Sequence, residues 1–159
     1  MTKDLYTFGY EGLSLDVFIG RLKSAGVERV IDVRATPLSR KRGFSKNGLS
    51  VALANAGIAY THSAAMGCPK PVRDRYKQDS NWTTYTQGFL SYLSENSEAL
   101  AEVAQIAKGS RSCLICFEAD YNRCHRTYVA RGAAQLANFR VKHITAESTV
   151  DDGAALSGV

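Results

Sequence analysis

Residues Ser112–Glu118 have the sequence SCLICFE, and this short stretch decides the fold class. An almost unbroken apolar run of this length is typical of a strand that is buried on both faces, as in a parallel sheet. Short apolar and aromatic runs predict four further strands, at residues 5–10, 29–34, 58–62 and 141–144. Helix-like patterns separate these runs. The alternation predicts an α/β fold: a three-layer sandwich whose mostly parallel sheet of about five strands has helices on both faces.

Apolar residues at helical spacing occupy most of the gaps between the strands. The pattern predicts helices from Ser14 to Gly26, around residues 47–57, over residues 83–108 with a possible break at Asn96, and over residues 123–137. Residues 63–82 lack this spacing and predict a long irregular segment, which is often functional or mobile. We expect a single α/β domain over residues 1–147 and a loose tail over residues 148–159.

Length and composition narrow the class of protein. The 159 residues suffice for one domain, and 45% hydrophobic with 22% charged residues argue against a mostly disordered or fibrous chain. No apolar run approaches the ~20 residues of a membrane span, and the first residues lack the apolar core of a signal peptide. We therefore expect a cytoplasmic protein without a membrane partner. The four cysteines are too few for a disulfide framework.

Positive charge is concentrated in one third of the chain. The formal net charge is +5, yet the stretch from Arg34 to Lys77 alone holds nine lysines and arginines against one acidic residue, Asp74. Such a concentration favours an anionic partner, either a small molecule or a nucleic acid. The alternative is a solvated loop that only keeps the protein soluble.

Polar and titratable residues follow the predicted strands. In parallel sheets the ligand binds beyond the carboxyl ends of the strands, where the strand order reverses. We assume the order 3-2-1-4-5, counting the five predicted strands along the chain, which places strands 1 and 4 beside the crevice. The candidate substrate- or anion-binding residues are Gly9, Tyr10, Asp32, Arg34, Ser39, Arg40, Tyr60 and Arg126, and the candidate catalytic residues are Glu11, Glu118, Cys124 and His125.

Cys124 is the sharpest of these candidates. It lies at the predicted start of a helix, where free amides and the helix dipole favour a thiolate. Arg123, His125 and Arg126 add positive charge that lowers a thiol pKa further, and a thiolate is the nucleophilic form of cysteine. The same basic helix start suits an anion site without covalent chemistry, with Arg126 as a bidentate clamp. A small apolar residue that only packs the helix against the sheet is the structural alternative.

Other uses of the cysteines are less well supported by the sequence. The spacing from Cys124 to Arg131 is one residue too long for a tyrosine-phosphatase loop, and residues 119–123 separate Cys124 from its strand, unlike a rhodanese loop. Cys113 and Cys116 lie three apart on a strand and point to opposite faces. Cys116, Cys124 and His125 remain an alternative zinc site, and Cys116 with Cys124 an alternative redox pair. The prediction is no metal and no cofactor.

Two carboxylates, Glu11 and Glu118, follow strands 1 and 4. Neighbouring carboxylates push their pKa values apart, which suits proton transfer, although each could instead pair with an arginine. Asp32 and Arg34 share one face of a strand, so one ligand could touch both. Several aromatic residues are candidates to stack on a base, with core packing as the alternative; they are Tyr10, Tyr60, Tyr76, Trp82 and Tyr121.

A set of motifs over roughly residues 5–145 resembles one protein family. The motifs are TFGYEG, IDVRATPLSRKRGF, IAYTH, MGCPKP, LICFEADYNRCHR and VKHI, in this order. Together they resemble the domain-of-unknown-function family 488 (DUF488), with one departure at Gly67-Cys68, where a second glycine is expected. The resemblance implies a stand-alone bacterial or archaeal α/β domain and no particular reaction. The motif residues are Gly9, Asp32, Arg34, Ser39, Arg40, Phe44, Tyr60, Cys116, Glu118, Cys124, His125 and Arg126.

The sequence is compatible with three classes of function. The first is an enzyme, a hydrolase or a transferase, that acts on a phosphate-bearing substrate such as a nucleotide or nucleic acid. The second is a nucleic-acid-binding module without catalysis, whose binding depends steeply on salt. The third is a sensor domain that binds a small anion without turnover.

Overall fold

The computed structural model describes residues 3–153. Its elements follow in the order β1 (Lys3–Gly9), α1 (Leu15–Ser24), β2 (Arg29–Asp32), α2 (Lys46–Asn55), β3 (Ala59–His62), the 3-10 turn η1 (Ala64–Met66), α3 (Lys70–Asp79), α4 (Trp82–Glu95), α5 (Ser97–Gly109), β4 (Ser112–Cys116), the 3-10 turn η2 (Tyr121–Arg123), α6 (His125–Ala137), β5 (Phe139–Ile144) and β6 (Thr149–Asp151). The helix expected over residues 83–108 is divided at Asn96 into α4 and α5, as the sequence suggested.

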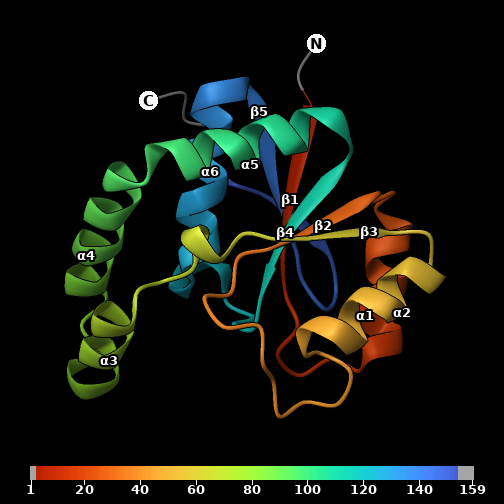
Figure 1. The fold of residues 1–159 in the computed structure, drawn as a ribbon, viewed down its shortest axis with the longest axis horizontal. Helices are drawn as coiled ribbons and strands as arrows, with labels where there is room; N and C mark the ends of the chain where they lie inside the picture. Colours follow the sequence, from red (N-terminus) through yellow and green to blue (C-terminus); the bar gives the residue numbers. More distant parts are fainter. Residues whose placement is uncertain (1–2, 154–159) are drawn as a thin grey trace.

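The described residues form one six-stranded sheet in the order β3-β2-β4-β1-β5-β6. The first five strands are parallel, and β6 pairs antiparallel with β5. Helices α1 and α2 cover one face, while α5 and α6 cover the other, with α4 packed beside them (Figure 1). The predicted three-layer α/β sandwich is confirmed.

Alternating side chains divide the core into two halves. Along β1, Tyr6 and Phe8 join the cluster under α1 and α2, whereas Leu5 joins the cluster under α4, α5 and α6. Every residue of β4 is buried, because this strand has neighbours on both sides and helices on both faces. The apolar run that first indicated a sheet is therefore the interior strand of that sheet.

The assumed strand order is wrong in one respect. It placed the first strand between the second and the fourth, whereas β4 lies between β2 and β1. Both orders use the same elements and similar connections, so local sequence patterns do not distinguish them. The observed order surrounds β4, the most continuously apolar strand, with a strand on each side. In both orders β1 and β4 are adjacent, so their carboxyl ends still meet.

Two expectations about irregular segments differ from the structure. The segment 63–82 contains η1 and the ten-residue helix α3, whose N-cap is Pro69 and whose second residue is Pro71. Proline is favourable in a first helical turn, so here it marks a start and not an interruption. The tail expected to be loose from residue 148 instead forms β6. Residues 154–159 of that tail lie outside the described residues.

Strand β6 is held by buried polar contacts. Asp152, next to its end, accepts two hydrogen bonds from the guanidinium of Arg131, at 2.9 and 3.0 Å, and one from Nε2 of His143 at 3.0 Å. The other nitrogen of this histidine, Nδ1, lies 2.6 Å from the Thr7 hydroxyl. The ring of Tyr121 in η2 stacks on His143 with centroids 4.0 Å apart. The C-terminal strand is thus connected to the loop that precedes α6.

No helix within residues 3–153 is long and apolar enough to cross a bilayer.

The carboxyl ends of β1 and β4 approach each other very closely at Gly9. The amides of Tyr10 and Glu11 continue the pairing past the end of β1, donating to the carbonyls of Cys116 and Phe117 at 3.1 and 2.8 Å. A Cβ atom on Gly9 would lie only 1.7 Å from the carbonyl oxygen of Glu118. Glycine is therefore needed here for space, and it lets the two loops that carry candidate carboxylates lie side by side.

We predict that Gly9→Ala lowers the free energy of unfolding by at least about 2 kcal/mol, because the methyl group would collide with backbone that cannot rotate away. The measurement is urea unfolding of the purified chain. The matched control is Gly20→Ala in α1, where a Cβ meets nothing within 4 Å. That change should leave stability unchanged or raise it by up to about 1 kcal/mol. Equal stabilities of the two variants would contradict the close approach at Gly9.

Candidate functional site

A pocket of about 530 Å³ opens at the carboxyl ends of β2 and β4, beside the start of α6. Its walls come from the loops that follow β1, β2 and β4, and from residues around α3 and α4. The lining residues are Tyr10, Arg34, Ala35, Thr36, Leu38, Ser39, Arg40, Lys41, Cys68, Arg73, Tyr85, Cys116, Phe117, Glu118, Arg123, Cys124 and His125. This is the edge of the sheet at which the sequence placed a ligand.

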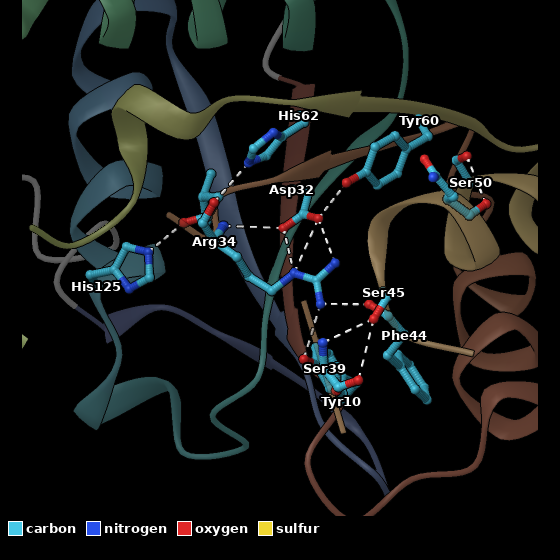
Figure 2. Close-up of polar contacts among 12 residues, drawn as sticks. Tyr10, Asp32, Arg34, Ser39, Phe44, Ser45, Ser50, Tyr60, His62 and His125 are labelled. Atoms are coloured by element: carbon cyan, nitrogen blue, oxygen red, sulfur yellow. Dashed lines mark hydrogen bonds and ion pairs between the residues drawn. The ribbon is translucent and has the colours of Figure 1, made fainter. Parts of the chain in front are cut away.

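One side of the pocket rests on a buried ion pair between Asp32 and Arg34 (Figure 2). The guanidinium donates to both carboxylate oxygens of Asp32, with Nε–Oδ1 at 2.9 Å and Nη2–Oδ2 at 2.7 Å. Its Nη1 donates to the Phe44 carbonyl at 2.6 Å and to the Tyr10 hydroxyl at 3.1 Å. The Tyr60 hydroxyl donates to Asp32 at 2.5 Å. Burial, and to a smaller extent the neighbouring Asp32 carboxylate, raises the pKa of Tyr60. Arg34 is therefore used to hold the protein together.

Two histidines bind the main chain beside this ion pair (Figure 2). The Nε2 atom of His62 lies 2.8 Å from the carbonyl oxygen of Arg34, and the Nε2 atom of His125 lies 2.7 Å from that of Val33. A carbonyl oxygen only accepts, so Nε2 of His125 carries the hydrogen. Burial lowers the pKa of His125, which favours the neutral ring. Its Nδ1 then has a free lone pair and lies 3.9 Å from Sγ of Cys124.

Cys124 lies immediately before the first residue of α6, with only 4% of its surface exposed. Burial raises the pKa of its thiol, but hydrogen bonding from Cys116 and the charge of Arg126 outweigh that effect and lower the pKa to about 7. Burial and the neighbouring Cys124 raise the pKa of Cys116 well above the ordinary value. The two thiols are thus unequal: Cys124 is the one that ionises, and Cys116 keeps its proton.

Arg126 lies behind these thiols and is completely buried. Its Nη1 is 3.4 Å from Sγ of Cys116 and donates to the Glu118 carbonyl at 2.5 Å, and its Nη2 is 3.5 Å from the Ala119 carbonyl oxygen. Within residues 3–153 its Nε is the one buried side-chain nitrogen or oxygen without a hydrogen-bond partner. Arg126 does not line the pocket, so its charge acts on the sulfur atoms from inside the protein.

Glu11 and Glu118 meet where the ends of β1 and β4 converge. Glu11 accepts a hydrogen bond from the amide of Ala119 at 3.1 Å. Hydrogen bonding with Glu118 and then with this amide lowers the pKa of Glu11. Burial and the charge of Glu11 raise the pKa of Glu118 to about 7. The pair thus contains a carboxylate that ionises readily, on Glu11, and a carboxyl group, on Glu118, that gives up its proton only at about pH 7.

Comparison with known families gives one match. The family model of domain of unknown function DUF488 matches residues 14–132, three quarters of the chain. The chain belongs to the DUF488 family. Searches among curated proteins and among solved structures each found no match. The resemblance seen in the sequence motifs is confirmed, and the matched region of this DUF488 protein contains Asp32, Arg34, Glu118, Cys124 and His125.

The structure brings together only part of the predicted site. Seven of the predicted residues line the pocket, and they are Tyr10, Arg34, Ser39, Arg40, Glu118, Cys124 and His125. The others support it from outside: Asp32 and Tyr60 belong to the network around Arg34, Gly9 allows the close approach of two loops, and Arg126 lies behind the thiols. Glu11 faces a separate hollow beside Leu13 and Glu147.

Several lining residues of the DUF488 pocket were missed by sequence reasoning. Cys68, Arg73 and Tyr85 come from the segment that was expected to be irregular and from α4. Hydrogen bonding to the Cys68 carbonyl at 3.1 Å anchors Nε of Arg73. The excess of positive charge between Arg34 and Lys77 was the available signal, but only the tertiary arrangement shows that Arg73 faces the thiols while its neighbour Arg75 does not.

The donor atoms of Cys116, Cys124 and His125 all lie within 4.8 Å of one another, close enough for one soft metal ion. The buried guanidinium of Arg126 lies against the same sulfur atoms and already supplies the positive charge that a thiolate needs. The arrangement therefore stabilises a thiolate with the protein's own residues.

We predict that Glu118 titrates at about pH 7 in the native protein. Its native pKa is raised, so between about pH 4.5 and 7 it holds a proton that the unfolded chain releases, and stability due to this group falls as the pH rises through that range. In Glu11→Gln the pKa should fall yet stay above 4.5, because burial remains. Carbon-13 NMR of the side-chain carboxyls measures the pKa of Glu118 in the wild type and in Glu11→Gln. The control is Glu102→Gln in α5, which should leave the pKa of Glu118 unchanged. A native midpoint near 4.5 would contradict the carboxylate pair.

Proposed function

We propose that this DUF488 protein is an enzyme that uses Cys124 as a nucleophile on a phosphate-bearing substrate bound in the pocket. The observation that carries the proposal is the thiol itself: it lies at the start of α6, beside the buried charge of Arg126, and lines a cavity with a cationic rim. A helix start and a neighbouring arginine are the surroundings that make a cysteine reactive. A merely structural cysteine does not need a pocket next to it.

The cations at the rim support an anionic substrate. Arg34 and Arg126 are occupied by contacts inside the protein, so substrate binding falls to Arg40, Lys41, Arg73 and Arg123. Glu118 is the only acidic residue among the lining residues, and with its pKa raised to about 7 it still carries its proton in about half of the molecules at pH 7. Cations on three elements, the loop after β2, α3 and η2, therefore act together to attract a negatively charged ligand into the pocket.

The apolar part of the rim fits a substrate that carries more than a phosphate group. Leu38 and Phe117 line the pocket although they are 74% and 50% exposed. The Arg123 guanidinium lies 5.5 Å from the centre of the Trp82 ring, which keeps this cation beside an aromatic surface. Exposed apolar side chains next to cations suit a nucleotide, in which a flat base is joined to a phosphate.

In the proposed reaction the thiolate of Cys124 attacks the electrophilic atom of the substrate and forms a covalent bond to it. The bond to the leaving group breaks, and protonated Glu118 supplies the proton that this group takes up. A second acceptor, water in a hydrolase or another substrate in a transferase, then releases the bound group and restores the thiolate. His125, neutral and with Nδ1 beside the sulfur, is placed to receive a proton from the thiol.

We predict that Cys124 is alkylated by iodoacetamide with an apparent pKa of about 7. The rate should rise as the pH increases through this value, because only the thiolate reacts. The measurement is residue-resolved mass spectrometry of the native protein. Cys113 is the internal control, since burial raises its pKa and it lies under α1 and α2, away from the pocket. An apparent pKa of Cys124 at or above the ordinary ~8.5 would refute the nucleophile.

We further predict that inorganic phosphate and nucleoside monophosphates slow the alkylation of Cys124, and that Arg73→Ala weakens this protection about tenfold, the effect of losing ~1.4 kcal/mol of binding free energy. The matched control is Arg75→Ala, which removes the same charge from the same helix but does not line the pocket. Equal loss in both variants would mean that protection reflects the general charge of α3 and not a bound substrate.

A non-catalytic nucleic-acid-binding module is the second candidate function. The observation in its favour is that basic residues continue outside the pocket, with Arg42 and Lys46 exposed on the loop after β2 and at the start of α2. The same alkylation experiment separates the two candidates. Protection of Cys124 by oligonucleotides alone, lost steeply with added salt and accompanied by a slow, high-pKa thiol, favours the binding module.

A further inference from the structure

Three of the four cysteines line one pocket, which is more than a single nucleophile requires. They are Cys68, Cys116 and Cys124, whereas Cys113 lies on the opposite face of β4. None forms a disulfide in the structure. Cys116 and Cys124 come from different elements, the end of β4 and the start of α6, and their sulfur atoms lie within 4.8 Å of each other. We propose that Cys124 is a peroxide-oxidised cysteine and that Cys116 is its resolving cysteine, so that the two form a reversible disulfide.

The surroundings of the two thiols assign different roles to them. Cys124 is the one stabilised as a thiolate, by Arg126 and by hydrogen bonding from Cys116. Cys116 remains a neutral thiol, and Nη1 of Arg126 lies 3.4 Å from its sulfur. A thiolate next to a neutral thiol favours oxidation of the thiolate to a sulfenic acid, which the neighbouring thiol then attacks to form a disulfide.

Access favours a small oxidant. Cys124 is only 4% exposed but faces the pocket, so a hydroperoxide can enter while a folded protein disulfide cannot approach the sulfur. The residues around the thiols are fixed: His125 is bonded to the Val33 carbonyl and Arg126 to the Glu118 carbonyl. The two sulfur atoms start within 4.8 Å of each other and must approach to about 2 Å for the disulfide to close.

The chemistry balances with a hydroperoxide as the oxidant. The Cys124 thiolate attacks the distal oxygen of the hydroperoxide, the O–O bond breaks, and the products are the sulfenic acid of Cys124 and an alcohol or water after proton uptake. Cys116 then attacks the sulfur of the sulfenic acid, an S–S bond forms, and hydroxide leaves with the Cys116 proton as water. Oxidation of Cys124 removes the negative charge beside Cys116, which leaves Arg126 to stabilise the attacking sulfur. A dithiol reductant returns both thiols.

This inference shares its reactive thiolate with the proposed function and adds control of it by oxidation. In the disulfide, the Cys124 sulfur is no longer available to a substrate. Cys68 does not have the same role, because it is not part of the cluster in which the sulfur atoms of Cys116 and Cys124 lie within 4.8 Å of each other. Its own thiol lies 3.8 Å from the carbonyl oxygen of Pro69. The pair is therefore specific, and a disulfide to Cys68 is not expected.

The test is to treat the reduced 159-residue chain with equimolar hydrogen peroxide and map its peptides without reduction. We expect one disulfide, between Cys116 and Cys124, that dithiothreitol reverses. In Cys116→Ser the disulfide should disappear, and the sulfenic acid of Cys124 should instead be trapped by dimedone. Cys68→Ser, which removes a thiol from the same pocket, is the matched control and should leave the disulfide intact.

The outcomes separate this inference from the proposed function. Fast alkylation of Cys124 near neutral pH without a disulfide to Cys116, or with irreversible oxidation at the same rate in wild type and Cys116→Ser, overturns the resolving role and leaves the nucleophile in place. A disulfide that forms normally while phosphate and nucleotides give no protection supports the redox pair and refutes the phosphate-bearing substrate. Should Cys116→Ser fail to fold, the peptide map of the wild-type chain still decides which cysteines are joined.

Discussion

The ion pair between Asp32 and Arg34 is buried, and the rest of the site is arranged around it. Removing a carboxylate and a guanidinium from water costs more than their attraction returns unless their other hydrogen-bonding groups are also satisfied. Here they are, by the hydroxyls of Tyr10 and Tyr60 and by the Phe44 carbonyl. The pair therefore constrains the loop after β2, because the Phe44 carbonyl at its far end must reach the guanidinium.

The backbone beside the ion pair also helps to position the thiols. The carbonyls of Val33 and Arg34, which flank the ion pair, bind the rings of His125 and His62. His125 begins α6 and directly follows Cys124, so the position of Cys124 depends on the backbone beside the ion pair. Tyr10 and Phe44, which both bond to the Arg34 guanidinium, stack with ring centroids 4.3 Å apart. In the sequence the Asp-x-Arg motif resembles a ligand-binding site. In the structure it instead supports the residues of the candidate site through internal hydrogen bonds.

The sequence predicted most helices and strands correctly, but it did not predict which side chains contact one another. Periodicity was sufficient for the five parallel strands, because burial on both faces imposes a local pattern that SCLICFE displays directly. It was insufficient for α3, where a proline at the N-cap and another in the first turn resemble a loop. It was also insufficient for β6, which is held by Asp152 and by contacts distant in sequence. The catalytic candidates around Cys124 were found because strand ends converge by rule. Which arginine side chains are held by internal contacts could not be predicted, because these contacts are made only in the tertiary structure. Arg34 and Arg126 are held in this way, whereas Arg73 lines the pocket.

The contacts of β6 extend the functional unit beyond the region that defines the family. Tyr121, in the turn just before Cys124, stacks on His143, and His143 is held by Thr7 and Asp152. Thr7, His143 and Asp152 all lie outside residues 14–132, the part matched by the family model. The matched region alone would therefore give too short a minimal domain. A chain trimmed to residues 14–132 would lose the ring on which Tyr121 stacks, and with it the anchor of the turn that precedes Cys124.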